Sequence, residues 1–286
     1  MQQAILVAVL VVMVYTVSLE LRPADFRYVL RRPLAVGIGL LAQFALLPGA
    51  TWALTMVLDL PPATEAAMML VAACPGGALS NVITAFGRGN LALSLSISAV
   101  SSVLALFLTP LNFTLMIAAN PATAAWARSI SVNPFDLVLS LVLLLAVPMS
   151  AAMLTSRYAP GVVARIRKPL ARVAGVALGL FIVIAVAAQW KLFVIELGRT
   201  LPIVILHNGL GLALGWLAAL AAKLAVADRR AVIIEGGMQN SGLALGIIAA
   251  QFGSDLSMVA VASLWGIWHI VSGSALALAW RRTSPT

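Results

Sequence analysis

The sequence predicts an all-α, polytopic membrane protein with nine transmembrane helices, and three observations lead to this class. Of its 286 residues, 62% are hydrophobic and only 9% are charged. Mean hydropathy is +1.06, which excludes a soluble domain with one buried core. Repeated apolar runs of about 17 to 25 residues are long enough for helices that cross a hydrocarbon core of roughly 30 Å, and too long for the strands of an outer-membrane barrel.

Nine spans account for these apolar runs. The first run has no basic segment before it and no convincing cleavage site after it, so we interpret it as a retained span and not a signal peptide. The longest connections, at about 119–134 and 156–169, carry Pro with Ser or Arg and are expected to be ordinary loops within one membrane domain, 1–286. The expected spans lie near residues 3–19, 34–58, 64–87, 90–118, 135–155, 170–189, 197–223, 229–252 and 256–280.

The basic residues predict the orientation of the chain. Fifteen of the 18 Lys and Arg residues fall in one set of alternating loops, and only Arg128, Lys191 and Arg199 fall in the other. Because cytoplasmic loops are enriched in Lys and Arg, we expect a cytoplasmic C-terminus and an external N-terminus. The net charge of +9 is spread over these loops, so membrane lipid and not nucleic acid is the expected partner.

Two spans combine helix breakers with polar groups. Pro75 removes a backbone hydrogen bond, and Gly76 and Gly77 each cost about 1 kcal/mol relative to Ala, so the third span is expected to break near 75–79. The eighth span holds a related motif at 235–242, and it enters from the opposite side, as an inverted repeat requires. Hydrocarbon offers no partner to freed backbone groups, so such breaks predict the ion and substrate site of a transporter.

Neutral oxygens follow the first break. Ser80 and Asn81 come directly after it, and Thr84 continues the polar face one turn later. Ser94 and Ser98 share one face of the next span. Hard cations prefer such oxygen ligands, so the two faces together predict an ion cage. The alternative is that these hydroxyls only join helices or bond to their own backbone carbonyls.

Glu235 is the only acidic residue placed clearly inside a span. One interpretation puts it at the interface, paired with Arg230, which lies five residues or about 7 to 8 Å away along the helix. The neighbouring helix break favours the other interpretation, an ion or proton site. Gln43, in the second span, is a buried amide that needs partners and serves either as a ligand or as a link between helices.

The two histidines predict no enzyme. His207 and His269 lie within the seventh and ninth spans, where each either packs or faces a substrate cavity. Neither has a nucleophile, a base or metal-ligand partners at motif spacing. We therefore expect a carrier and not a membrane enzyme.

On these motifs the sequence resembles the bile acid:sodium symporter family, particularly its short bacterial members. The motifs are Cys-Pro-Gly-Gly-x-x-Ser-Asn at 74–81, Gly-Asn-x-Ala-Leu-Ser at 89–94 and Glu-x-Gly-Met-Gln-Asn-Ser-Gly-Leu-Ala at 235–244. The resemblance implies a bacterial inner-membrane protein whose inverted-repeat core contains two crossing discontinuous helices. Beside the core lies a second group of helices, the panel. We expect the panel at 1–33 and 119–192 and the core at 34–118 and 193–286.

The resemblance also implies two sodium sites and a substrate site. The first sodium site would use Ser80, Asn81, Ser94, Ser98 and Glu235. The second would use Gln43, Glu235 and Gln239, with the carbonyls of Gly236 and Met238. Asn240 and His269 match positions that face the organic anion, whereas Ala78 and Ile270 replace polar residues often found in relatives. Specificity is therefore expected to differ, toward another carboxylate such as a pantoate-like acid instead of a conjugated bile acid.

The predicted function is sodium-coupled import of an organic anion by alternating access. A proton-coupled carrier, or an anion or arsenite-type exporter of related fold, is the alternative. The first alternative requires an essential carboxylate without a sodium effect, and the exporter would give a role to Cys74.

Overall fold

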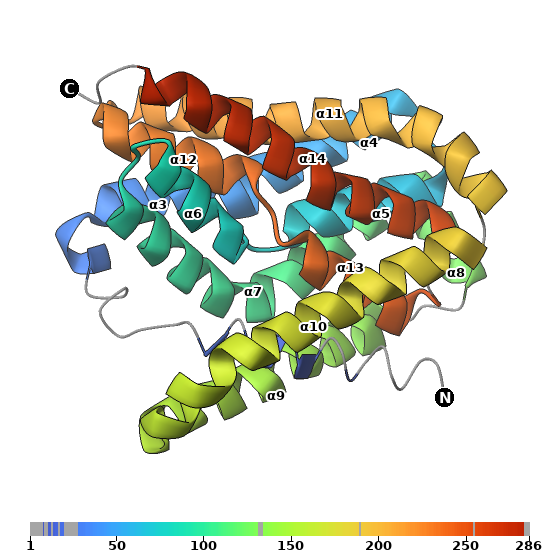
Figure 1. Cartoon of the computed structure of the whole chain (residues 1–286). Coiled ribbons are helices and arrows are strands. Elements are labelled where there is room, and N and C mark those ends of the chain that lie inside the picture. The colour runs from blue at the N-terminus through green and yellow to red at the C-terminus, as the bar shows by residue number, and fades with distance from the viewer. Residues whose placement is uncertain are drawn as a thin grey trace.

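The computed structural model describes residues 8, 11–12, 14–16, 18–19, 28–130, 134–188, 190–253 and 255–282. Most of the predicted first span lies outside this set. Within the described residues every regular element is a helix, and the helices form one bundle (Figure 1). They are α3 (Pro33–Leu41), η1 (Ala42–Leu46), α4 (Leu47–Leu58), α5 (Pro62–Ala73), α6 (Ala78–Phe86), α7 (Leu91–Ala119), α8 (Pro121–Ser129), α9 (Pro134–Tyr158), α10 (Pro160–Ala188), α11 (Trp190–Ala221), α12 (Val226–Gly237), α13 (Ser241–Gln251) and α14 (Leu256–Arg281).

Five helical segments of the described chain are long and apolar enough to cross a membrane. This confirms a multi-pass, all-helical membrane protein, while the count of nine spans stays a prediction. The segments are Pro33–Leu58, Leu91–Ala119, Val138–Tyr158, Leu197–Ala221 and Leu256–Arg281.

The two predicted helix breaks are present. The third expected span divides into α5 and α6, and the eighth divides into α12 and α13. Both breaks are short stretches of extended backbone, and they meet in an isolated antiparallel bridge between Gly76 and Gln239. In Figure 1 the segment that connects α5 to α6 and the segment that connects α12 to α13 cross in the middle of the bundle. The crossing places the ends of four half-helices at one point.

The half-helix α5 lies in the interior of the bundle. Every residue from Thr64 to Ala73 is buried, so protein covers α5 on all sides, as expected for an apolar helix without a polar face. On α10, by contrast, Val173, Val176 and Val183 are largely exposed, which suits contact with lipid. Helices α9 and α10 lie together on one side of the bundle (Figure 1).

Helix α7 is attached at both ends to the half-helices that precede the breaks. At its start, the Asn90 side chain donates to Asp228 Oδ1 on α12 at 2.7 Å. Just past its end, Asn120 donates to Glu65 Oε2 on α5 at 2.9 Å. Both carboxylates lie in the first turn of their helices and are buried. Two amide–carboxylate contacts therefore fix α7 relative to α5 and α12.

The two connections predicted as loops are largely helical, so that prediction was wrong. Helix α8 occupies most of 119–134, capped by Asn120, whose Oδ1 accepts from Ala122 N at 2.9 Å. Only Ala159 separates α9 from α10, so 156–169 is almost entirely helical. Pro121 and Pro160 stand at the first position of their helices, where a missing N–H costs nothing, so proline starts a helix here instead of marking a loop.

Candidate functional site

The crossing satisfies most of the backbone groups that the breaks release. Asn240 N donates to Pro75 O at 2.8 Å, and Gly77 N donates to Met238 O at 3.2 Å. The Gln239 amide lies against one further carbonyl as well as that of Pro75, and its nitrogen donates to Cys74 O at 2.7 Å and to Pro75 O at 3.2 Å. These contacts replace the helical hydrogen bonds that Pro75 and the glycines interrupt.

Glu235 lies fully buried on α12, one turn before the second break. Its Oε1 accepts from Ser80 Oγ at 2.6 Å, from Ser94 Oγ at 2.6 Å and from Ser98 Oγ at 3.1 Å. Ser98 Oγ is also 3.1 Å from Glu235 Oε2. Three hydroxyls from α6 and α7 thus surround one carboxylate.

No basic side chain among the described residues pairs with Glu235. The ion pair that the described residues do form joins Arg32 to Asp228, with 3.8 Å between Arg32 Nη1 and Asp228 Oδ2. Arg230 donates through Nη1 to Gly87 O at 3.1 Å, and its guanidinium lies over the Trp280 ring. The alternative in which Arg230 pairs with Glu235 is therefore wrong, and the carboxylate lies inside the bundle instead of at the interface.

The cluster around Glu235 has more oxygen acceptors than hydroxyl protons. Asn81 Oδ1 lies 2.9 Å from Ser94 Oγ and 3.4 Å from Ser98 Oγ. Ser94 and Ser98 each carry one hydroxyl proton and face both Asn81 and Glu235, so each can donate to only one of them at a time. All five residues predicted for the first sodium site therefore come together in one oxygen-rich cluster.

Other serines of α7 show the alternative role, in which a hydroxyl bonds to a backbone carbonyl of its own helix. Ser96 Oγ donates to Ala92 O at 2.8 Å, and Ser102 Oγ donates to Ser98 O at 2.7 Å, so both bond to their own helix. Ser94 and Ser98 instead direct their hydroxyls across to α6 and α12. Ser94 and Ser98 therefore connect α7 to α6 and α12, whereas the hydroxyls of Ser96 and Ser102 bond within α7.

Gln43 contacts Glu235 at its backbone and not through the three serines. Its Nε2 donates to the backbone carbonyl of Glu235 at 3.0 Å, while its Oε1 is buried without a hydrogen-bond partner. A buried amide oxygen without a partner is uncommon and calls for an explanation such as an ion. Gly76 packs directly against this pair, because a Cβ there would lie 2.6 Å from Gln43 Nε2 and 2.7 Å from Glu235 Oε2.

A π-turn positions Gln43, and sequence reasoning missed its cause. Pro48 has no N–H, so the carbonyl of Phe44 four residues earlier has no helical donor. Asn112 Nδ2, on α7, donates to that carbonyl at 2.8 Å. The chain over Ala42–Leu46 widens into a π-turn, a feature often found at functional sites. The signal in the sequence was a proline inside a span that has Gln43 one turn before it.

A pair of polar residues that sequence reasoning also missed supports the break between α12 and α13. Asn208 Nδ2, on α11, donates to Gly237 O at 2.6 Å, and Ser272 Oγ, on α14, donates to Asn208 Oδ1 at 2.6 Å. The neighbouring His207 is buried, lies 2.7 Å from Thr51 Oγ1 and contacts the Trp265 ring. His207 therefore packs inside the bundle, which is the first of the two roles expected from the sequence.

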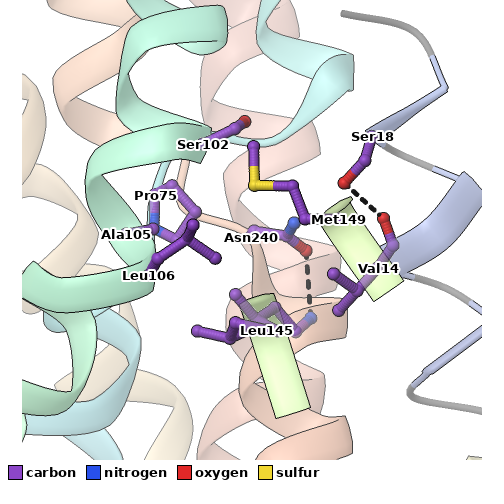
Figure 2. A pocket seen from close by; sticks show the side chains of 10 residues that line it. Val14, Ser18, Pro75, Ser102, Ala105, Leu106, Leu145, Met149 and Asn240 are labelled. Carbon is purple, nitrogen blue, oxygen red and sulfur yellow. Dashed lines mark hydrogen bonds between the residues drawn. The ribbon is translucent and has the colours of Figure 1, made fainter. Parts of the chain in front are cut away.

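Asn240 lines a cavity beside the crossing. The cavity encloses about 470 Å³ including its mouth, and its wall is mostly apolar. Figure 2 shows Asn240 between Pro75 on one side and Met149 on the other, with its Oδ1 accepting from Leu243 N at 3.0 Å. The remaining lining residues come from the first segment, α7 and α9: Val14, Ser18, Ser102, Ala105, Leu106 and Leu145.

Two of the other predicted substrate residues, His269 and Ile270, do not line this cavity. His269 is buried on α14, and its Nδ1 has no hydrogen-bond partner. Ile270 is 42% exposed on the outside of the same helix. Ala78 begins α6 and is described by its backbone alone. Of the three residues whose side chains are described, the structure brings only Asn240 to the cavity, and a substrate role for His269, Ile270 and Ala78 stays a prediction.

Two broken helices that cross around a buried carboxylate define an architecture used by secondary transporters. The model of the sodium bile acid symporter family matches residues 7–196, and the chain belongs to this family. The family predicted from the sequence motifs is thereby confirmed.

Three relatives illustrate the range of similar proteins. An uncharacterized sodium-dependent transporter of Bacillus subtilis, YocS, is 34% identical over 274 residues, which are 95% of this chain and 81% of the relative. A probable chloroplastic sodium/metabolite cotransporter of Arabidopsis thaliana is 29% identical over 91% of this chain and 63% of its own length. The human ileal sodium/bile acid cotransporter is 28% identical over 87% of this chain and 70% of its own length.

Proposed function

We propose that the protein is a sodium-coupled symporter that imports a small organic anion by alternating access across the bacterial inner membrane. The observation that carries this proposal is Glu235, a fully buried carboxylate that three hydroxyls surround and no described basic side chain neutralises. A buried charge is costly unless it is paired, so the arrangement favours a bound cation. The names of the relatives, which are sodium-dependent transporters or sodium cotransporters, support sodium as that cation.

The first sodium site consists of Glu235 with Ser80, Asn81, Ser94 and Ser98. Sodium binding would let each hydroxyl turn a lone pair toward the ion, so that the charge of the cation, and no longer hydrogen bonds from neutral hydroxyls, stabilises the carboxylate. Because α6, α7 and α12 all contribute, an ion here would hold the two broken helices and α7 together. Occupancy of the site would thereby be linked to the arrangement of the crossing.

The second sodium site uses Gln43, Gln239 and Glu235 with the carbonyls of Gly236 and Met238. The unpartnered Gln43 Oε1 supports an ion in this place. Rotation of the Gln239 amide by half a turn would place its oxygen beside the carbonyls of Cys74 and Pro75, a group of oxygens that a cation would stabilise. Met238 O accepts one hydrogen bond from Gly77 N and keeps a second lone pair for an ion.

The organic anion binds in the cavity beside the crossing. The cavity wall includes Pro75 and Asn240 from the core, and Val14, Leu145 and Met149 from the segments assigned to the panel. Relative movement of the panel, 1–33 and 119–192, and the core, 34–118 and 193–286, would open this space to one side of the membrane and then to the other. Its apolar wall and single amide suit a carboxylate with a hydrocarbon body, such as a pantoate-like acid or a bile acid.

Proton coupling is the second candidate, because a buried carboxylate without a basic partner is also a suitable proton carrier. An arsenite-type exporter receives no such support. Cys74 is fully buried and belongs to the hydrophobic cluster around Phe113 and Trp265. We therefore retain sodium coupling with nine spans, an external N-terminus and a cytoplasmic C-terminus as the proposed arrangement.

The test is thermal unfolding of the purified protein in sodium and in potassium, with and without a panel of carboxylates, alongside Glu235→Gln. Glu65→Gln is the matched control, because Glu65 is also buried but accepts from Leu60 N and Asn120 at the far end of α5. Sodium should raise the melting temperature of the wild type and of Glu65→Gln, and should leave Glu235→Gln unchanged. An undiminished sodium response in Glu235→Gln would overturn the proposal, and substrate uptake that follows pH and ignores sodium would favour proton coupling.

A further inference from the structure

A second hollow in the bundle shares no lining residue with the cavity beside the crossing. It is a groove of about 1040 Å³, open space included, between α11, α12 and α14. The wall is almost entirely hydrocarbon and indole surface. The apolar residues that form it are Leu212, Ala213, Trp216, Ile233, Leu276 and Trp280.

The groove runs from one end of the bundle toward the middle of the membrane. Leu212 lies nine residues before the end of α11 at Ala221, a rise of about 13 Å. Leu276 lies five residues before the end of α14 at Arg281. One leaflet of a bilayer contributes about 15 Å of hydrocarbon, so the groove is about as deep as one leaflet. An acyl chain fits this depth.

The shallow end of the groove is basic. Arg229 and Arg230 line it, and Lys223, Arg281 and Arg282 lie at the same ends of α11 and α14. The guanidinium of Arg230 is engaged within the protein, since it donates to Gly87 O and lies over the Trp280 ring. Arg229 has no carboxylate partner within the described chain, because the adjacent Asp228 is taken by Asn90 and Arg32. Positive charge therefore meets the headgroup region directly above an apolar channel.

We propose that this groove binds an anionic phospholipid of the leaflet at the ends of α11 and α14. Its phosphate would lie on Arg229, and one acyl chain would follow Leu212, Trp216 and Leu276 into the membrane. A free phosphate ion would gain nothing from the apolar wall, and a zwitterionic lipid would gain less from the basic end. By the predicted orientation, this leaflet is the cytoplasmic one, where such lipids and basic residues occur together.

The lipid would contact the helix that carries Glu235. Leu212, in the groove wall, packs where a Cβ on Gly237 would be. Gly211 and Gly215 of α11 lie against the backbone of α12 at Gly236 and Val232. These glycines let the two helices approach closely, so the wall of the groove adjoins the contact between α11 and the helix that carries Glu235.

Titration of the full-length protein with phosphatidylglycerol and phosphatidylcholine, followed by native mass spectrometry, tests this proposal. The variants are Arg229→Gln, which removes the headgroup contact, and Ala213→Phe, which fills the groove from an exposed position on α11. Arg282→Gln is the matched control, since it removes the same charge from an exposed position that does not line the groove.

We expect phosphatidylglycerol to bind more tightly than phosphatidylcholine. Arg229→Gln should weaken phosphatidylglycerol binding about fivefold, the usual effect of one basic residue near a membrane surface, and Ala213→Phe should weaken both lipids. Arg282→Gln should retain most of the affinity, and size-exclusion profiles of all variants confirm that they fold. Equal losses in Arg229→Gln and Arg282→Gln, or equal affinity of the wild type for the two lipids, would overturn the proposal.

Discussion

Substitution of Gly76 by alanine should damage ion binding far more than the same substitution at the adjacent Gly77. A Cβ at position 76 would lie 2.6 Å from Gln43 Nε2 and 2.7 Å from Glu235 Oε2. Ordinary contact begins at 3.4 Å, so each of these atoms must retreat by about 0.7 to 0.8 Å. At Gly77 the nearest atoms would be 3.8 Å away, in normal contact.

The magnitude follows from what the displaced atoms do. Moving Gln43 weakens its hydrogen bond to the Glu235 carbonyl, and a buried polar group that loses its partner costs about 1 to 3 kcal/mol. The same movement takes both side chains away from the proposed sodium ligands. We therefore expect Gly76→Ala to weaken sodium binding at least tenfold, about 1.4 kcal/mol. Gly77→Ala should stay within about threefold of the wild type, or roughly 0.7 kcal/mol.

Isothermal titration of sodium into the purified variants, in a potassium background, measures this difference. Circular dichroism without sodium shows whether each variant keeps its helices. If Gly76→Ala bound sodium with wild-type affinity, or if the two glycine variants lost affinity equally, Gln43 and Glu235 would have no special dependence on the space at position 76 and the reasoning would fail.

Three further predictions concern neighbouring side chains. Ser98→Ala should weaken sodium binding about fivefold by removing a hydroxyl from Glu235, while Ser96→Ala, whose hydroxyl bonds to Ala92 O, should match the wild type; the same titration distinguishes them. Asn112→Leu should lower the unfolding free energy by about 1 to 3 kcal/mol, because Phe44 O would be buried without a donor; denaturant unfolding would show no change if the π-turn closed by itself. Asn240→Ala should lose the cap of α13, about 1 kcal/mol, and should also weaken binding of the organic anion; unaltered anion binding in calorimetry would remove Asn240 from the substrate site.

The sequence predicted the breaks because their causes are local. Pro75 has no N–H to donate and the paired glycines are poor helix formers, and each break lies at or directly after these residues. The cluster of hydroxyls was also expected from spacing, since Ser94 and Ser98 share a helix face and Ser80 and Asn81 follow the break. The helical connections were missed because proline both ends helices and starts them, and the sequence alone did not distinguish the two uses.

The supporting residues could not be predicted because their roles depend on which helices meet. Asn112 lies far from Phe44 in the chain, and nothing in its own segment indicates that it supplies the donor that Pro48 lacks. The same holds for Asn208, which satisfies Gly237 O from a different helix. His269 and Ile270 are adjacent in sequence, but only His269 is buried on α14 and neither lines the cavity, so their place in a motif did not predict contact with it.

The attachment of α7 at both ends has a consequence for how the carrier can move. Asn90 holds the start of α12 and Asn120 holds the start of α5, so the helix that bears Ser94 and Ser98 cannot slide relative to either broken helix without losing a buried amide–carboxylate contact. The oxygens around Glu235 would therefore keep their mutual spacing while the protein changes shape. The ion would stay within a rigid group formed by α5, α7 and α12. The movement would occur where this group meets α9.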